Sequence, residues 1–224
     1  MKVTQANRQI CSITEESEIP LIGCISFGVI DRGTNVLQIR PTSICVLSCI
    51  FCSTDAGPCS RWRQVEYVVE LDYLLSTIRE ILKIKRGNRM EAHIDTVGDP
   101  LTYPHIVELV HKLSEFSEFN VISLQTHGVL LNDKLIDELA EAGLSRINLS
   151  IDALDEKLSK KLSGTDFYDI YRIIEIAEYI ASSPIDLLIA PVWIPSLNDY
   201  EIPRIINFAM KIGAGKHWPP LGIQ

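Results

Sequence analysis

Strand-like and helix-like segments alternate along most of this chain, and this alternation constrains the fold more than any other feature. Apolar residues recur at helical spacing in five segments, 71–82, 106–116, 135–142, 167–180 and 202–212. β-like runs lie between them at 92–97, 121–126, 146–152 and 187–193. Strands that alternate with helices at this spacing indicate repeated βα units and a parallel sheet.

Two further β-like runs, 21–30 and 35–40, precede the alternation and flank a turn signal at 31–34. We therefore expect a hairpin that leads into the main sheet. A closed barrel of eight βα units takes about 250 residues, whereas this chain of 224 residues holds only five such units and a strand fragment at 221–224. The predicted fold is α/β, a partial (open) βα barrel with about six parallel strands behind an N-terminal β-hairpin.

We expect residues 1–34 to form an N-terminal extension with the first hairpin strand, and residues 35–224 to form the partial barrel. A strand at 221–224 would have no following helix to cover its outer face. We therefore expect that a C-terminal segment is missing from the barrel.

The chain carries six cysteines and a formal net charge of −8. An acidic protein does not attract phosphate backbones over long range, which weighs against nucleic-acid binding. The longest apolar runs, 21–30 and 187–194, are shorter than the about 20 residues of a spanning helix, so no membrane partner is expected. Without a secretory signal the predicted location is cytoplasmic, where cysteines serve as thiols or metal ligands rather than disulfides.

Polar residues alternate with apolar ones on three successive predicted strands. They share one face, which points into the barrel if helices cover the outside. These residues are His93 and Asp95, then Ser123, Gln125 and His127, then Asn148, Ser150 and Asp152. Because a barrel interior is usually apolar, the pattern predicts a lumen that holds a ligand.

Three thiols lie in the loop after the first barrel strand, at Cys45, Cys49 and Cys52. Their spacing, C-x3-C-x2-C, allows one loop to direct several thiolates at one inorganic centre. A zinc site completed by Cys59 and simple buried thiols are the alternatives. Three cysteine ligands on a four-iron cluster leave one iron open.

The segment resembles the cluster-binding signature C-x3-C-x-aromatic-C of the radical S-adenosylmethionine (radical SAM) superfamily, with Phe51 at the aromatic position. This resemblance implies that Cys45, Cys49 and Cys52 hold a [4Fe–4S] cluster and that S-adenosylmethionine chelates the open iron. It implies reductive cleavage to a 5'-deoxyadenosyl radical, which abstracts hydrogen from a substrate. A one-electron donor of the ferredoxin or flavodoxin type is the implied partner.

Further segments are similar to motifs of this superfamily, and of its molybdopterin-cyclase branch and uncharacterised archaeal members in particular. Gly98-Asp99-Pro100 resembles the end of the Gly-Gly-Glu-Pro segment that carries the methionine amino group, and Thr126 begins a Thr-Asn-Gly-like segment. Ser150 and Asp152 correspond to strand residues near S-adenosylmethionine. The resemblance implies that these residues, with Phe51, contact that cofactor.

The substrate remains open among RNA, a peptide and a small metabolite, and neither His93 nor His127 receives a catalytic role. Cys59 lines the site, joins Cys11 and Cys24 at a second cluster, or is an ordinary thiol. The alternative function is a non-catalytic iron–sulfur or zinc-binding module, in which Cys59 supplies the fourth ligand.

Overall fold

The computed structural model of the protein describes residues 8–85, 87 and 89–224, and its centre is one curved sheet. The sheet has six strands in the order β2-β3-β5-β6-β7-β8. The strands are β2 (Gly28–Asp31), β3 (Val36–Arg40), β5 (Met90–Ile94), β6 (Phe119–Thr126), β7 (Arg146–Leu149) and β8 (Asp186–Ile189). β2 is antiparallel to β3, and the others run parallel. The sheet does not close, which confirms the open α/β barrel.

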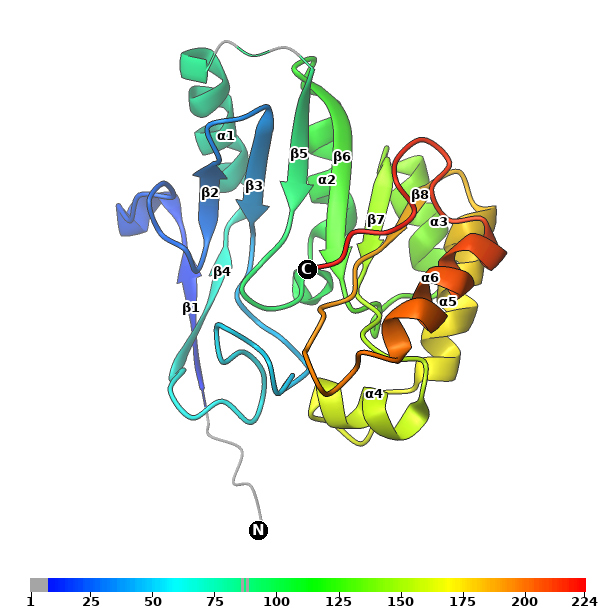
Figure 1. Cartoon of the computed structure of the whole chain (residues 1–224). Coiled ribbons are helices and arrows are strands. Elements are labelled where there is room, and N and C mark those ends of the chain that lie inside the picture. The colour runs from blue at the N-terminus through cyan, green and yellow to red at the C-terminus, as the bar shows by residue number, and fades with distance from the viewer. Residues whose placement is uncertain (1–7, 86, 88) are drawn as a thin grey trace.

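Five helices pack on the outer face of the sheet, while the concave face is turned toward the viewer in Figure 1. They are α1 (Leu71–Lys85), α2 (Ile106–Ser114), α3 (Asp133–Glu141), α5 (Ile170–Ser182) and α6 (Glu201–Ile212). α1 buries the apolar stripe that predicts it, from Leu71 to Leu82. α3 begins after Asn132, whose side chain accepts a hydrogen bond from the Leu135 amide at 3.0 Å.

The period of two along the strands separates the core from the lumen. In β7 all four residues are buried, yet Ile147 and Leu149 belong to the apolar core, whereas Arg146 and Asn148 bond to each other on the inner face. The helices thus cover an apolar outer face, and the polar inner face is left for ligands.

The first predicted strand is wrong in its bounds, because of the run 21–30 only residues 28–30 belong to β2, which continues to Asp31. Gly28 adopts a φ of 90°, and the Val29 amide donates to the Leu21 carbonyl at 2.7 Å. A side chain at Gly28 would lie 2.1 Å from that carbonyl oxygen. The chain therefore folds back on itself before it enters the sheet.

Several short elements escape the sequence patterns. β1 (Gln9–Ile13) and β4 (Val65–Val69) form a separate two-stranded parallel sheet beside the barrel (Figure 1). The single-turn helices η1 (Glu15–Ser17) and η2 (Pro100–Thr102) and the helix α4 (Glu156–Ser163) are also new. Of these, α4 and η2 lie beside the cysteine loop or the strand ends that face it.

The C-terminal residues run along the free edge of β8. Leu221 forms a parallel bridge with Ile189, and the Gly222 amide donates to the Ile189 carbonyl at 2.9 Å. The expected strand at 221–224 is therefore present as a bridge. Across the described ranges, no helix combines the length and the apolar character that crossing a bilayer requires.

Candidate functional site

A cavity of about 620 Å³ lies where the carboxyl ends of the strands meet the loop that follows β3. In Figure 1 the arrowheads of β3, β5 and β6 point toward this loop. The cavity wall includes Cys45, Cys49, Phe51 and Cys52 from the loop, Thr96, Val97 and Gly98 after β5, Gln125, Thr126 and His127 at the end of β6, and Ser150 after β7. Motifs that are separated by up to about a hundred residues thus meet at one edge of the sheet, as parallel βα units require.

The three loop thiols are half-buried and close enough to affect one another's charge. Burial, with smaller contributions from the neighbouring Asp99 and Cys52, raises the pKa of the Cys45 thiol to about 12, although the Leu47 backbone amide opposes the shift. The pKa of Cys49 is also raised, first by burial and then by the charges of Cys45, Asp152 and Cys52. Three thiolates in this cavity therefore need a compensating cation, which an iron–sulfur cluster supplies.

The thiols are not placed as ligands of one metal ion. Within the described residues, no three histidine, cysteine, aspartate or glutamate side chains converge closely enough to hold one metal ion. A structural zinc ion needs four ligands on one centre. Each thiolate of an iron–sulfur cluster binds a different iron, so the three sulfurs have to stand farther apart.

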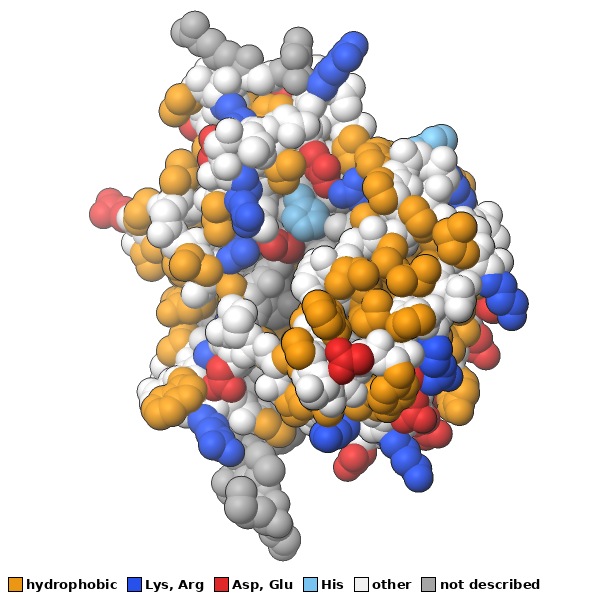
Figure 2. All heavy atoms as spheres, in the orientation of Figure 1, with side chains coloured by type: hydrophobic (Ala, Val, Ile, Leu, Met, Phe, Trp, Pro, Cys, Tyr) orange, Lys and Arg blue, Asp and Glu red, His pale blue; other side chains and the backbone are white. Residues whose placement is uncertain are grey.

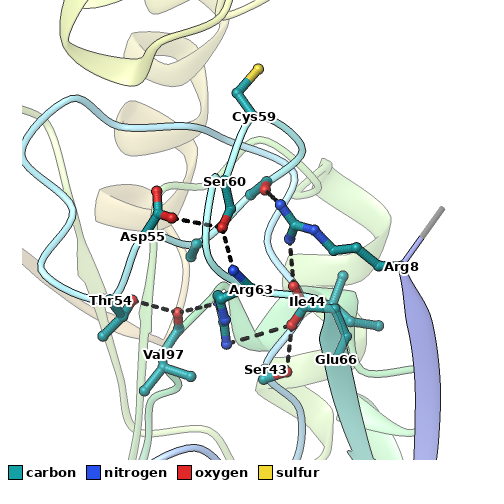
Figure 3. Close-up of polar contacts among 12 residues, drawn as sticks. Arg8, Ser43, Ile44, Thr54, Asp55, Cys59, Ser60, Arg63, Glu66 and Val97 are labelled. Atoms are coloured by element: carbon teal, nitrogen blue, oxygen red, sulfur yellow. Dashed lines mark hydrogen bonds and ion pairs between the residues drawn. The ribbon is translucent and has the colours of Figure 1, made fainter. Parts of the chain in front are cut away.

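Cys59 does not share the cavity of the three loop thiols. It is exposed, it is absent from the residues that line the cavity, and its backbone amide donates to the Ser48 hydroxyl at 3.1 Å. Figure 3 shows its sulfur turned away from the polar contacts of the loop. Cys59 is thus not placed as a fourth ligand. In the described part of the chain it also forms no metal-binding group with Cys11 and Cys24.

Cys52 receives two polar contacts from the loop that follows it. The Ala56 amide donates to Cys52 Sγ at 3.3 Å, and the Thr54 hydroxyl lies 3.3 Å from the same sulfur. Thr54 Oγ1 also donates to the Val97 carbonyl at 2.9 Å. These contacts hold Cys52 against the end of β5. Only the Ala56 amide would stabilise a thiolate at Cys52, because the single hydroxyl proton of Thr54 is donated to Val97.

A buried ion-pair network holds the cysteine loop to β4 (Figure 3). Glu66 is 4% exposed and lies between Arg8, with Nη1 at 2.6 Å, and Arg63, with Nη2 at 3.5 Å. The Ser43 hydroxyl donates to the second carboxylate oxygen at 2.5 Å. Arg63 also donates to the Val97 carbonyl at 3.2 Å, so the network joins β4, the loop and the end of β5.

Gly98 is required by the close approach of the loop to β5. A Cβ at this position would lie 2.2 Å from the Ile44 carbonyl oxygen and 2.4 Å from that of Ser43. The next residue, Asp99, donates its backbone amide to the same Ile44 carbonyl at 2.8 Å. The predicted motif therefore fits the cavity through its backbone.

Asp99 serves the protein's own backbone, and it does not line the cavity. Its side chain is 2% exposed and accepts from the Leu101 amide at 3.0 Å, the Thr126 hydroxyl at 2.9 Å and the His127 amide at 3.1 Å. Pro100, buried in η2, is likewise outside the cavity wall. Asp99 thus ties the end of β5 to the end of β6.

Ser150 lies in the cavity wall, whereas Asp152, like Asp99, does not. Ser150 lines the cavity and accepts a hydrogen bond from Gln125 Nε2 at 2.9 Å. Asp152 lies behind the wall, where its carboxylate accepts from the Val192 amide at 2.8 Å. Burial raises the pKa of this carboxyl, and the neighbouring His127 opposes the shift. Asp152 joins the end of β7 to the segment after β8.

Phe51 anchors the loop on one side. Its ring packs against a small apolar cluster of Ala153, Leu158 and Leu162 around α4. Two backbone bonds, from Ser48 to the Ser163 carbonyl and from Ile50 to the Leu162 carbonyl, each 3.0 Å, dock the loop on the end of the same helix. The aromatic position of the signature therefore has a packing role as well as a place in the cavity wall.

The wall also contains residues that the sequence analysis did not single out, among them Arg40, Thr96 and Gln224. Arg40 follows Gln38 by two positions on β3, and the same period of two that indicates the other lumen residues could have found it. Gln224 enters through the pairing of the C-terminal segment with β8, which no local pattern indicates.

The family model described as "Radical SAM superfamily" matches residues 39–209, more than half of the chain. Uncharacterized protein MJ0103 of Methanocaldococcus jannaschii is 49% identical over 219 residues, which cover 92% of this chain and 51% of that protein. GTP 3',8-cyclase of Clostridium botulinum is 27% identical over 181 residues, which cover 80% of this chain and 54% of that protein. The chain thus spans about half the length of these curated relatives.

Solved structures show the same fold. SuiB of Streptococcus suis, bound to its precursor peptide SuiA, matches with a TM-score of 0.64 and 22% identity, over 84% of this chain and 38% of SuiB. TYW1 with a lysine–pyruvate adduct matches with a TM-score of 0.53 and 20% identity, over 80% of this chain and 61% of TYW1.

Proposed function

The chain belongs to the radical SAM superfamily, and from this premise we propose that it is an enzyme that holds a [4Fe–4S] cluster through Cys45, Cys49 and Cys52. When bound, the cluster and S-adenosylmethionine supply a one-electron cleavage to a 5'-deoxyadenosyl radical, which abstracts hydrogen from a substrate. The observation that carries the proposal is the single cavity in which the three thiols face the ends of β5, β6 and β7.

The residues of the cavity have separate roles in this proposal. The three cysteines bind the cluster, and the backbone at Gly98 together with Thr126 and Ser150 contacts S-adenosylmethionine. Asp99 acts indirectly, because it holds Thr126 and the His127 amide in place. The apolar support under Phe51 keeps water from one side of the cavity.

The test is anaerobic reconstitution with iron and sulfide, followed by addition of a reductant and S-adenosylmethionine. We expect about four irons per chain and release of 5'-deoxyadenosine. A spectroscopically intact cluster that releases none would contradict the enzyme assignment.

Cys59 provides the matched control. We expect C45A, C49A and C52A each to lose most of the cluster absorbance and all 5'-deoxyadenosine release. C59A, which removes an exposed cysteine outside the cavity, is expected to retain both. Loss of the metal in C59A would instead support the non-catalytic module, in which Cys59 is the fourth ligand.

The proposed partners are a one-electron donor of the ferredoxin or flavodoxin type and a substrate that is not yet identified. SuiB was solved with a peptide, and the curated cyclases are named for GTP. Proteins with related folds thus act on or bind different molecules. The substrate site of this chain therefore has to be sought in the barrel outside the cofactor cavity.

A further inference from the structure

A second cavity, of about 540 Å³, lies in the lumen at the amino ends of the strands. Figure 2 shows the hollow on the concave face, with basic, acidic and histidine side chains around it. Its wall contains Gln38 on β3, Glu91 and His93 on β5, Arg146 and Asn148 on β7, and Arg32 from the β2–β3 turn. None of these residues lines the cysteine cavity.

The register of the sheet assembles a row of polar side chains in this second cavity. Gln38 pairs with His93, His93 with Ser123, and Ser123 with Arg146, each across neighbouring parallel strands. Side chains at paired positions lie on the same face of a sheet. The row is therefore a direct product of the alternation that predicts the polar lumen.

The hydrogen bonds in this row fix which atom carries each proton. Ser123 Oγ donates to Glu91 Oε1 at 2.6 Å, and Glu91 Oε1 also pairs with Arg146 Nη2 at 2.5 Å. Glu91 Oε1 thus accepts from both the Ser123 hydroxyl and the Arg146 guanidinium. The single hydroxyl proton of Ser123 is then already used, and the 2.7 Å contact between Ser123 Oγ and His93 Nδ1 requires the proton on Nδ1.

The other ring nitrogen of His93 is left as an acceptor. Burial lowers the pKa of His93. Asp95, directly after β5, and Glu91 on β5 oppose this shift, and Arg146 on β7 and Arg32 in the β2–β3 turn add to it. The ring is thus neutral at pH 7, and Nε2 bears a lone pair. In the described structure no residue forms a hydrogen bond with Nε2. Every buried side-chain nitrogen and oxygen of the described residues has a partner, so Nε2 is not buried and is open to the cavity.

We propose that this lumen cavity is the substrate pocket and that His93 presents Nε2 there as the proton acceptor for a small polar molecule with an N–H or O–H donor. The inference rests on the proposed function, since it names the substrate class for the same barrel. In the transfer, the donor bond breaks, the electron pair stays on the donor atom, and the proton moves to Nε2. Glu91, through Ser123, and Asp95 balance the charge of the resulting imidazolium.

The volume supports a small ligand, because pockets of about 300–1,000 Å³ accommodate small molecules. Gln38 and Arg40 both bond to Asp95, with Gln38 Nε2 at 2.7 Å from Oδ2 and Arg40 Nε at 3.2 Å from Oδ1. Arg40 also lines the cysteine cavity. This polar layer thus connects the pocket with the cofactor cavity.

The first arm of the test uses diethyl pyrocarbonate, which modifies unprotonated imidazole nitrogens, on the cluster-loaded protein. We expect modification of His93, located by peptide mass spectrometry, with a midpoint below about pH 6.5. In S123A, the Nδ1–H faces the carboxylate of Glu91 without the intervening hydroxyl, and we expect the midpoint to move upward. An unreactive His93, or a midpoint that S123A leaves unchanged, overturns the relay.

The second arm measures 5'-deoxyadenosine release with and without the low-molecular-weight fraction of an anaerobic extract of the source organism. We expect that fraction to accelerate 5'-deoxyadenosine release by the wild type. The increase in the release rate of H93Q should be smaller by a factor of about ten or more, which corresponds to about 1.4 kcal/mol. The response of each variant is measured relative to its own basal release, and E80A, at an exposed ion pair on α1, is the control that should keep both the basal release and the response. Equal responses of wild type and H93Q overturn the pocket.

The two arms separate this inference from the proposed function. If the wild type releases no 5'-deoxyadenosine although its cluster is intact, the enzyme assignment fails whatever the state of His93. If release occurs and His93 is unreactive or irrelevant to the response, the pocket fails and the enzyme assignment stands.

Discussion

Asp99 and Asp152 show how single residues of a family motif can act through the backbone of neighbouring strands. Each carboxylate is buried behind the cavity wall and accepts from groups that follow another strand. The shared location of the three thiols and Phe51 was predictable, because their signature lies within one short segment. The roles of the two aspartates were not, because their partners lie 28 and 40 residues away in sequence.

The substitution D99A tests the structural role of this carboxylate. It leaves the Thr126 hydroxyl and the amides of Leu101 and His127 without their acceptor in a buried place. We expect a loss of about 3 kcal/mol in the free energy of unfolding, measured by urea titration. The control E80A, on the exposed face of α1, should change it by less than about 0.5 kcal/mol. Weaker S-adenosylmethionine binding with unchanged stability would instead indicate direct contact.

Among the elements, the cysteine loop and the end of β5 are joined by a backbone contact too close for a side chain. The alternation of strands and helices was readable, because each element is long enough to show its period. The strands β1 and β4 could not be predicted in this way, because each has five residues and its partner strand is far away in sequence. The contact at Gly98 depends on the path of the cysteine loop, and the turn signal of Gly98-Asp99-Pro100 alone could not predict it.

The substitution G98A is expected to push the loop from β5. Its Cβ would stand 2.2 Å from the Ile44 carbonyl oxygen, so backbone has to move. We expect a loss of about 3 kcal/mol or more in stability and reduced iron content after reconstitution. G213A is the matched control, since a Cβ there meets nothing within 4 Å and only the positive φ of 74° is strained. A cost of about 1 kcal/mol is expected for the control, and equal costs would argue against the close approach.

On the scale of the whole molecule, the last residues close the free edge of β8. Asp186, at the start of β8, accepts three backbone amides from the C-terminal segment, Lys216 at 2.9 Å, His217 at 2.6 Å and Trp218 at 3.1 Å. Period and turn signals could place a strand near 221, but the tether lies outside any local pattern. The sequence therefore predicted the segment and not what holds it.

This tether predicts a dependence of stability on pH. Burial raises the pKa of Asp186, but the amides of His217, Lys216 and Trp218 outweigh it, and the pKa is lowered below 3.8. The stabilisation is therefore complete above about pH 3.8 and is lost as the pH falls through the lowered pKa. Urea titrations between pH 2 and 6 should show this loss in the wild type and a smaller one in D186N. Identical pH profiles would exclude Asp186 as the source.

Backbone contacts also join the two ends of the cysteine loop. Thr42 bridges to Val68, the Ser43 amide donates to the Tyr67 carbonyl at 2.9 Å, and the Val69 amide donates to the Pro41 carbonyl at 2.8 Å. The entropy of bringing the two ends of this loop together is therefore lost when the protein folds, before any cofactor enters. Assembly of a metal centre then has to order only the interior of a tethered loop, so the affinity for iron depends on the folding of β4 as well as on the thiols.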